Sequence, residues 1–212
     1  MKSYTTAARE AEAEQIIEKS RFIACVRPVC DRDEAEAFFV ARRTLHRAAT
    51  HNVPVFVLGE KGALQWASDD GEPQGTAGAP ILRMLLAEGL TNVALTVTRY
   101  FGGVKLGTGG LVRAYTGAAR RAVEESGICD VCEQAILTYR IDYSLLGKLQ
   151  GLVRQGELFR IKDVAFSDAA VVTLASPAEN ADALAALVAD ISAGTGELLA
   201  RGTELVAVAR RS

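Results

Sequence analysis

Apolar residues in the first 130 positions alternate between strand-like runs and the spacing of an amphipathic helix. Short apolar runs rich in β-branched residues predict strands, and apolar positions three and four apart predict helices. The predicted strands cover residues 16–29, 51–59, 63–68 and 93–100, and the predicted helices start near residues 31, 79 and 111. Asp31 with Glu34 matches a capping box, and Pro54 predicts an edge position or the start of its strand.

A second pattern begins near residue 130. Residues 135–142 read as a strand, 143–155 as a helix, 159–166 and 169–175 as a hairpin, 178–191 as a helix and 198–208 as a strand. The order βαββαβ is typical of a ferredoxin-like domain. We therefore predict an α+β protein with two domains, residues 1–132 and residues 133–212.

Two glycine-rich segments each lead into a predicted helix of the first domain. Glycine adopts positive φ and lets backbone approach closely, and a helix start offers unpaired N–H groups to an anion. If both segments lie at one edge of the sheet, they predict a joint site for negative charge. They are Gly75-Thr76-Ala77-Gly78 and the segment that carries Gly102, Gly103, Gly107, Thr108, Gly109 and Gly110.

Basic residues are concentrated around the second segment. No acidic residue occurs between Glu88 and Glu124, while this interval contains Arg99, Lys105, Arg113, Arg120 and Arg121. One interpretation is structural, with glycines forming a tight turn and arginines on a solvated helix face. The other is an anion site, above all for nucleic-acid phosphate. The segment matches neither a P-loop nor a dinucleotide-binding fingerprint.

Composition and charge limit the classes of function and the location that remain open. The formal net charge of -2 and the pI near 5.8 argue against a generally basic coat protein, so a nucleic-acid site has to be a local patch. No apolar run is long enough to span a bilayer, and the N-terminus has no apolar signal region. We expect a cytoplasmic protein whose four cysteines are reduced.

Three carboxylates, Asp69, Asp70 and Glu72, follow one another within a turn. They match no calcium-binding loop, and the open alternatives are a solvated turn, an acid–base group, or partners for Arg99 or Arg113. The spacing of His46 and His51 is not that of a helical metal pair, and the one CxxC, Cys129 to Cys132, follows a helix. We therefore assign no catalytic residue and expect neither metal nor cofactor.

Four strings, KSRFIA, HNVPVFVLG, SDDGEPQGTAGAPIL and TNVALTVTRYFGGVKLGTGGLVRAY, resemble the YigZ/IMPACT family. The resemblance implies a first domain like domain IV of elongation factor G and a second like its domain V. Eukaryotic relatives are translational regulators that bind an activator of a starvation-responsive kinase. The positions that fall on the family's motifs are Lys19, Ser20, Arg21, His51, Asp69, Asp70, Gly71, Glu72, Pro73, Gly75, Gly78, Arg99, Tyr100, Phe101, Lys105 and Arg113.

These observations lead to one main hypothesis and two alternatives. The main one is a non-enzymatic regulator of translation or stress response that binds RNA or the ribosome through the basic glycine segments, with Lys19 and Arg21 included and Tyr100 and Phe101 available for base stacking. The first alternative is a small-molecule or phosphate-ester enzyme that uses Asp69, Asp70 or Glu72 as its base. The second is an adaptor for a translation-associated protein. We expect no membrane partner.

Overall fold

The structure, a computed structural model, describes residues 3–156 and 159–209. The chain divides into two compact units, built mainly from residues 4–130 and residues 131–206. None of the helices in the described ranges combines the length and apolarity that a membrane crossing requires. The two-domain α+β prediction is confirmed.

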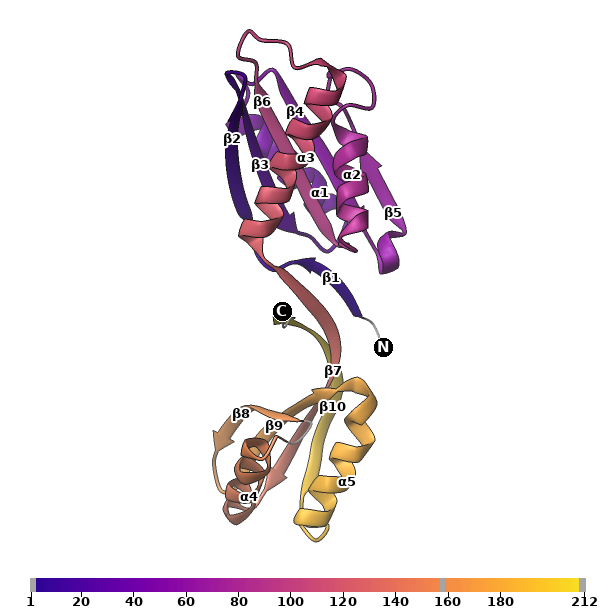
Figure 1. The fold of residues 1–212 in the computed structure, drawn as a ribbon. Helices are drawn as coiled ribbons and strands as arrows, with labels where there is room; N and C mark the ends of the chain where they lie inside the picture. Colours follow the sequence, from indigo (N-terminus) through magenta and orange to yellow (C-terminus); the bar gives the residue numbers. More distant parts are fainter. Residues whose placement is uncertain (1–2, 157–158, 210–212) are drawn as a thin grey trace. The chain divides into compact units, whose positions relative to one another are not determined.

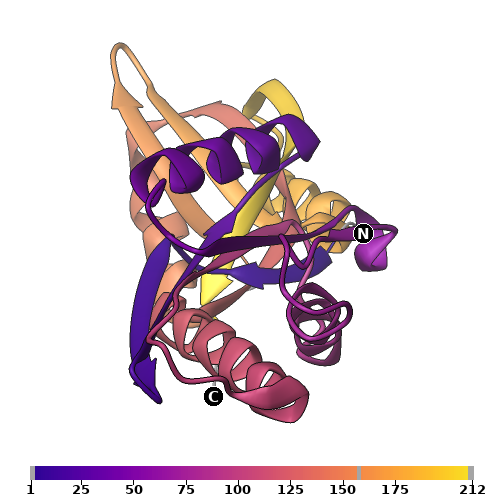
Figure 2. The same ribbon diagram turned by 90° about the horizontal axis from the view of Figure 1, so that it is seen from above.

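The N-terminal unit is a five-stranded antiparallel sheet with helices on both faces (Figures 1 and 2). Its strand order is β2-β3-β6-β4-β5. In chain order the strands are β2 (Ala11–Ile17), β3 (Ser20–Pro28), β4 (His51–Leu58), β5 (Leu64–Ala67) and β6 (Val93–Tyr100). The helices are α1 (Arg32–Leu45), α2 (Gly78–Ala87) and α3 (Gly107–Ser126), with a 3-10 turn at Glu60–Gly62 labelled η1.

Alternate residues of the sheet build two separate cores, as the twofold repeat of a strand requires. One face packs Phe22, Val55 and Val97 against the small and aromatic side chains of α2 and α3. The other face packs Cys25 and Phe56 against α1. The central strands are therefore buried on both sides, which explains their almost continuous apolar sequences.

Two predicted boundaries in this unit are wrong. The predicted strand 16–29 is a hairpin of β2 and β3, because Glu18 and Lys19 turn the chain with φ of 45° and 64°. The predicted loop over residues 107–110 is already helical, because α3 starts at Gly107.

Pro54 is also not at an edge, since β4 lies between β6 and β5. The missing N–H is tolerated because the β5 pairing begins one residue later, at Val55 opposite Ala67. The Pro54 carbonyl, which points to the same side as its nitrogen, accepts a hydrogen bond from Ser68 just beyond β5.

The C-terminal unit has the predicted βαββαβ order. Its elements are β7 (Ile128–Ile141), α4 (Tyr143–Arg154), β8 (Arg160–Phe166), β9 (Ala170–Pro177), the 3-10 turn η2 (Ala178–Asn180), α5 (Ala181–Ile191) and β10 (Glu197–Ala209). The order of its hydrogen-bonded strands is β7-β9-β8, with β10 also paired with β7. Strand β1 (Ser3–Ala7), whose residues from Tyr4 on belong to the N-terminal unit, also pairs with β7. Strand β7 is longer than predicted and runs without a break through the predicted boundary at residue 132.

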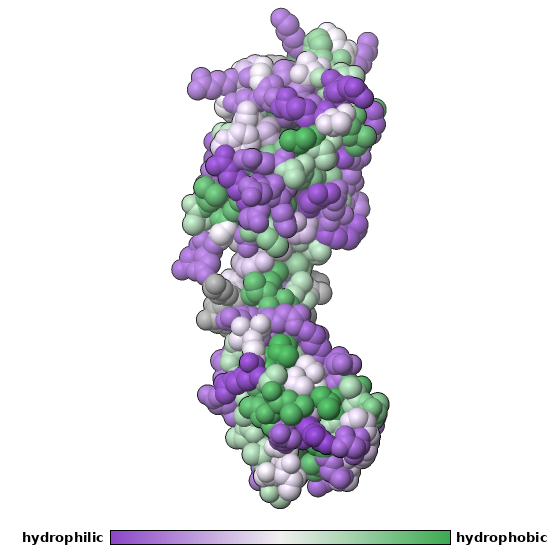
Figure 3. All heavy atoms as spheres, turned by 180° about the vertical axis from the view of Figure 1, so that it is seen from behind, coloured by the Kyte–Doolittle hydropathy of each residue, from purple (hydrophilic) through white to green (hydrophobic). Residues whose placement is uncertain are grey.

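The C-terminal core lies between the sheet and its two helices, with Leu137, Leu149, Leu174 and Val188 at its centre. Some apolar side chains of this unit stay exposed, including Phe166, Leu198 and Leu205. Figure 3 shows apolar surface gathered on this unit.

Candidate functional site

A pocket of about 470 Å³ opens in the N-terminal unit where the ends of several elements meet. Its walls come from the start of β4, the turn before α2, the end of β6 and the first turn of α3. The lining residues are Thr50, His51, Glu72, Pro73, Arg99, Phe101, Lys105, Leu106, Gly107, Thr108 and Leu111. The pocket thus joins segments that are up to 61 residues apart in sequence, from Thr50 to Leu111.

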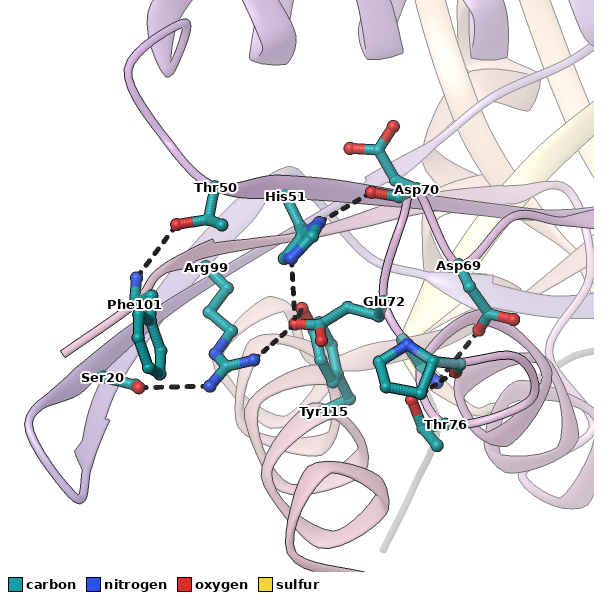
Figure 4. Close-up of polar contacts among 12 residues, drawn as sticks. Ser20, Thr50, His51, Asp69, Asp70, Glu72, Thr76, Arg99, Phe101 and Tyr115 are labelled. Carbon is teal, nitrogen blue, oxygen red and sulfur yellow. Dashed lines mark hydrogen bonds and ion pairs between the residues drawn. The ribbon is translucent and has the colours of Figure 1, made fainter. Parts of the chain in front are cut away.

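Glu72 is a buried carboxylate with two strong donors. Its Oε1 accepts from Arg99 Nη1 at 2.7 Å and from the Tyr115 hydroxyl at 2.6 Å (Figure 4). The Glu72 side chain is only 3% exposed, so the positive charge of Arg99 offsets the cost of burying it. Burial, together with the hydrogen bond to Glu72, raises the pKa of Tyr115, which therefore stays a neutral donor.

Arg99 is positioned by β6 and held between two aromatic rings. Its guanidinium carbon lies 5.4 Å from the centre of the Phe22 ring and 5.3 Å from that of Phe101, and Nη2 lies 3.4 Å from Ser20 Oγ. Its Nε–H has no hydrogen-bond partner among the described residues. Of the alternatives open for Arg99, the structure therefore has the carboxylate pairing: the guanidinium is buried and paired with Glu72.

His51 stands at the start of β4, opposite Arg99 in the pairing with β6. Its Nδ1 lies 2.7 Å from the Asp70 carbonyl oxygen, and its Nε2 lies 3.7 Å from Glu72 Oε1 (Figure 4). Beyond its position on a family motif, His51 was predicted to have no chemical role. The neighbouring Asp-Asp-Gly-Glu turn was the available signal, but only the fold brings it to the histidine.

The first glycine segment is already occupied by a carboxylate of the protein. Asp69 accepts from the backbone N–H groups of Gly75 at 2.7 Å, Ala77 at 3.0 Å and Gly78 at 2.8 Å. Burial raises the pKa of Asp69, but these three hydrogen bonds outweigh it and the net pKa lies below the usual 3.8. The predicted anion site at Gly75, Thr76 and Gly78 is therefore wrong, because Asp69 fills it.

Asp70 is also part of the framework of the turn. Its carboxylate accepts hydrogen bonds from the Asn52 backbone N–H and from Arg43 Nη2, both at 2.6 Å. The next residue, Gly71, has a φ of 87°. The Thr76 hydroxyl donates to the Pro73 carbonyl at 2.6 Å. Of the three carboxylates considered as a base, only Glu72 lines the pocket.

The start of α3 is different, because no side chain among the described residues caps it. The N-cap residue is Leu106, which makes no side-chain hydrogen bond, and Lys105, Gly107 and Thr108 line the pocket. A Cβ at Gly109 would lie 3.6 Å from Arg113 Nη1, so the Arg113 guanidinium lies beside the first turn. Unpaired amides, the positive end of the helix dipole and basic side chains coincide here.

Gly102 and Gly103 shape the loop that brings Lys105 to the pocket. A Cβ at Gly102 would lie 2.0 Å from the Lys19 carbonyl carbon, and the Gly102 N–H lies 3.2 Å from Ser20 Oγ. Gly103 has a φ of 86°. Ser20 therefore links the β2–β3 turn both to this loop and to Arg99.

The other predicted basic residues lie away from the pocket lining. Arg21 forms two 2.7 Å hydrogen bonds to Glu14, and Arg120 pairs with Glu88 at 2.7 Å. Arg121 shares a separate hollow with glutamates 12, 14, 124 and 125. Lys19 is exposed at the β2–β3 turn.

The two predicted stacking residues point to different places. The Tyr100 hydroxyl oxygen lies 3.0 Å from His46 Nδ1, and Tyr100 does not line the pocket. Phe101 does line it and is 47% exposed.

Comparison with known proteins places these features in a family. Residues 18–123 match the Impact N-terminal domain, and residues 140–195 match a domain of unknown function, DUF1949. The chain therefore belongs to the IMPACT family, which confirms the resemblance.

Individual relatives cover most of the chain. The IMPACT family member YvyE of Bacillus subtilis is 40% identical over 78% of this chain and 76% of its own length. The IMPACT family member YigZ of Escherichia coli is 33% identical over 94% of this chain and 98% of its own length. A solved structure described as a hypothetical protein is 32% identical, with a TM-score of 0.62 over 94% of this chain and 98% of that one.

Proposed function

We propose that the N-terminal unit binds single-stranded nucleic acid by holding a phosphate at the start of α3, and that the protein acts as a non-enzymatic regulator of translation or of a stress response. The observation that carries this proposal is the uncapped start of α3, which forms one wall of the pocket together with Lys105. A helix start with free amides binds phosphate through both hydrogen bonds and the dipole. Arg113 adds a second cation beside it.

The rest of the pocket suits a nucleotide better than a bare phosphate. Phe101, Pro73, Leu106 and Leu111 provide apolar wall, and exposed aromatic rings bind unpaired bases by stacking. Because an unpaired nucleotide enters a concave site more readily than one inside a duplex, a single strand is the expected form.

The enzyme alternative has less support from the same contacts. Asp69 and Asp70 both hold backbone N–H groups of the protein, and Glu72 Oε1 is bonded to Arg99 and Tyr115. A general base needs an accessible lone pair within reach of a substrate proton. The three carboxylates proposed as bases are instead used to build the pocket.

The experiment is a titration of a labelled single-stranded RNA with the full chain at several salt concentrations. The variant Lys105→Glu is expected to weaken binding about tenfold and to reduce the slope of log affinity against log salt by about one. Arg83→Glu is the matched control, because Arg83 is exposed on α2 and outside the pocket lining. Salt-independent binding, or equal loss in both variants, would refute the proposal.

The regulatory part of the proposal needs a separate measurement. If the protein acts on the translation machinery, wild-type protein is expected to co-sediment with ribosomal particles from a lysate, and Lys105→Glu is expected to stay in the unbound fraction. Equal sedimentation of both proteins would show that any contact with the ribosome does not involve the pocket.

A protein-binding adaptor is the second candidate, and β5 favours it. This short edge strand exposes 47% of Leu64 and 44% of Trp66, and open edges with apolar side chains are used for strand addition. If the wild-type protein captures a protein partner even after nuclease treatment, and Trp66→Arg no longer captures it, the adaptor function is favoured over nucleic-acid binding.

A further inference from the structure

His46, the C-cap residue of α1, takes part in a chain of side-chain contacts outside the pocket lining. Its Nε2 lies 3.1 Å from Arg42 Nη2, and its Nδ1 lies 3.0 Å from the Tyr100 hydroxyl oxygen. Arg42 is only 8% exposed and also donates to a carboxylate oxygen of Glu12. The contacts therefore connect β2, the end of α1 and the end of β6.

These contacts determine the protonation state of the His46 ring. A guanidinium group has only donors, so Arg42 has to donate and His46 Nε2 has to accept with its lone pair. The hydrogen of the imidazole is then on Nδ1, which donates to the Tyr100 oxygen. Turning the ring over would place carbon atoms at both contacts, so the orientation is also fixed. The observed arrangement therefore requires a neutral His46.

Protonation of the ring conflicts with this arrangement. A hydrogen on Nε2 would point at an N–H of Arg42, and two positive groups would then lie side by side. The charged and titratable residues that face the ring are Arg42 from α1, Glu12 from β2, Arg21 from β3 and Tyr100 from β6. Burial lowers the pKa of His46, and Arg42 and Arg21 lower it further against the opposing effect of Glu12.

The two partners of the His46–Tyr100 contact are close in sequence to one wall of the pocket. Thr50 follows His46 by four residues, and Phe101 directly follows Tyr100. Thr50 and Phe101 both line the pocket, and Thr50 Oγ1 accepts a hydrogen bond from the Phe101 backbone N–H at 3.1 Å. The His46–Tyr100 contact therefore holds together the two segments that form this wall.

We propose that His46 is a pH-sensitive switch between the end of α1 and the end of β6, closed while its ring is neutral and open when the ring is protonated. Opening releases the Thr50–Phe101 hydrogen bond and loosens this wall of the pocket. The inference concerns the free protein and does not depend on the proposed function.

The direction of the pH dependence follows from the two states of the ring. The released ring has the ordinary pKa of about 6.5, and the closed ring has a lower pKa, so the closed state binds fewer protons. The stability of the closed state relative to the open state is therefore complete above about pH 6.5 and is lost as the pH falls through the closed-state pKa.

The first test is nitrogen NMR of the free protein, whose two histidines are His46 and His51. The neutral His46 ring is expected to carry its hydrogen on Nδ1 and to titrate below an ordinary histidine. Arg42→Met removes the neighbouring charge and is expected to raise the titration midpoint of His46. A hydrogen on Nε2 of the neutral ring, or a midpoint unchanged in Arg42→Met, would overturn the inference.

The second test is hydrogen exchange of the Phe101 N–H at pH 7.5 and pH 5 in the wild type and in His46→Gln. Glutamine offers one donor and one acceptor group but does not titrate, so this variant is the control that stays closed in acid. The ratio of the wild-type rate to the variant rate cancels the intrinsic effect of pH on exchange. It is expected to be near unity at pH 7.5 and to rise severalfold at pH 5.

The variant His51→Asn separates the two histidines, because it is expected to keep the wild-type acceleration of exchange in acid. A ratio of wild type to His46→Gln that is the same at both pH values contradicts the switch, as does loss of the acceleration in His51→Asn. If His46→Gln fails to fold, the position of the ring hydrogen and the titration of His46 in the wild type decide the question.

Discussion

Arg99 donates a 2.7 Å hydrogen bond from Nη1 to Glu72 Oε1, and this pair connects the end of β6 to the turn before α2. The Arg99 side chain is 6% exposed and that of Glu72 is 3% exposed. An ion pair buried to this degree adds little to stability compared with apolar residues of the same size. Loss of one partner, however, leaves the other charge buried and uncompensated. The pair therefore makes the pocket sensitive to single substitutions.

Glu72→Ala is expected to lower the free energy of unfolding of the N-terminal unit by about 3–5 kcal/mol, because Arg99 would stay buried without its counter-charge. The protein's single tryptophan, Trp66, belongs to this unit, so its fluorescence in a urea titration reports the relevant transition.

The double variant Glu72→Leu with Arg99→Met is the control for this prediction. It replaces both charges by apolar groups and is expected to recover most of the lost stability. If Glu72→Ala has the same urea midpoint as the wild type, breaking the buried Arg99–Glu72 pair does not destabilise the N-terminal unit.

Asp69 provides a pH-dependent link between the turn and α2. Asp69→Ala is expected to cost about 1–2 kcal/mol, the usual effect of removing a helix cap. Because the folded-state pKa of Asp69 is lowered, its stabilisation is complete above the unfolded pKa of about 4 and is lost as the pH falls through the folded value. Urea titrations at pH 7 and near pH 3 are expected to show a smaller difference between wild type and variant in acid.

Asp69→Asn keeps the shape and one acceptor oxygen but cannot titrate in this range. Its unfolding free energy is expected to lie between those of wild type and Asp69→Ala at pH 7. The wild type and Asp69→Asn are compared by their free energies of unfolding. If the difference between them is the same at neutral and acidic pH, the electrostatic part of the explanation is contradicted.

Local patterns predicted the elements better than they predicted the site. Strand β6 was predicted with its observed bounds, Val93–Tyr100, because its first six residues are all apolar or β-branched and have one simple interpretation. The β2–β3 turn was missed because Glu18 and Lys19 adopt positive φ without a glycine or asparagine to signal it.

The site depends on contacts that sequence spacing does not encode. Asp69 caps amides six to nine residues further along the chain, a distance outside any capping motif. The pairing of Arg99 with Glu72 was one of the alternatives considered, but the sequence could not distinguish it from an exposed cation. Only the three-dimensional fold brings His51 and Glu72 within 3.7 Å.

Gly102 is expected to tolerate no side chain, in contrast to Gly109 of α3. In Gly102→Ala the new Cβ would meet the Lys19 carbonyl group at 2.0–2.1 Å, so the loop has to move away from the β2–β3 turn. A loss of about 3 kcal/mol is expected, together with weaker RNA binding, because the same loop carries Lys105. Urea titration and the RNA titration measure the two effects.

Gly109→Ala is the matched control for Gly102→Ala. Its Cβ would have an ordinary contact at 3.6 Å, and alanine favours the helix by up to about 1 kcal/mol relative to glycine. The variant keeps the backbone N–H and is expected to bind RNA like wild type. Equal destabilisation by both substitutions would show that close approach to Lys19 is not the cause.

The cysteines provide the last test, because their environments differ. Burial raises the pKa of Cys25 to about 11, and the side chain lies in the core between the sheet and α1. Cys30 is exposed beside the start of that helix. Because only the thiolate reacts, alkylation of the native protein at pH 8 is expected to label Cys25 about 100-fold more slowly than an ordinary thiol, and Cys30 well before it. Mass spectrometry of the digested protein at successive times measures both rates. In urea the difference between the two cysteines is expected to disappear, and native labelling of Cys25 as fast as Cys30 would mean that this face of the sheet opens without global unfolding.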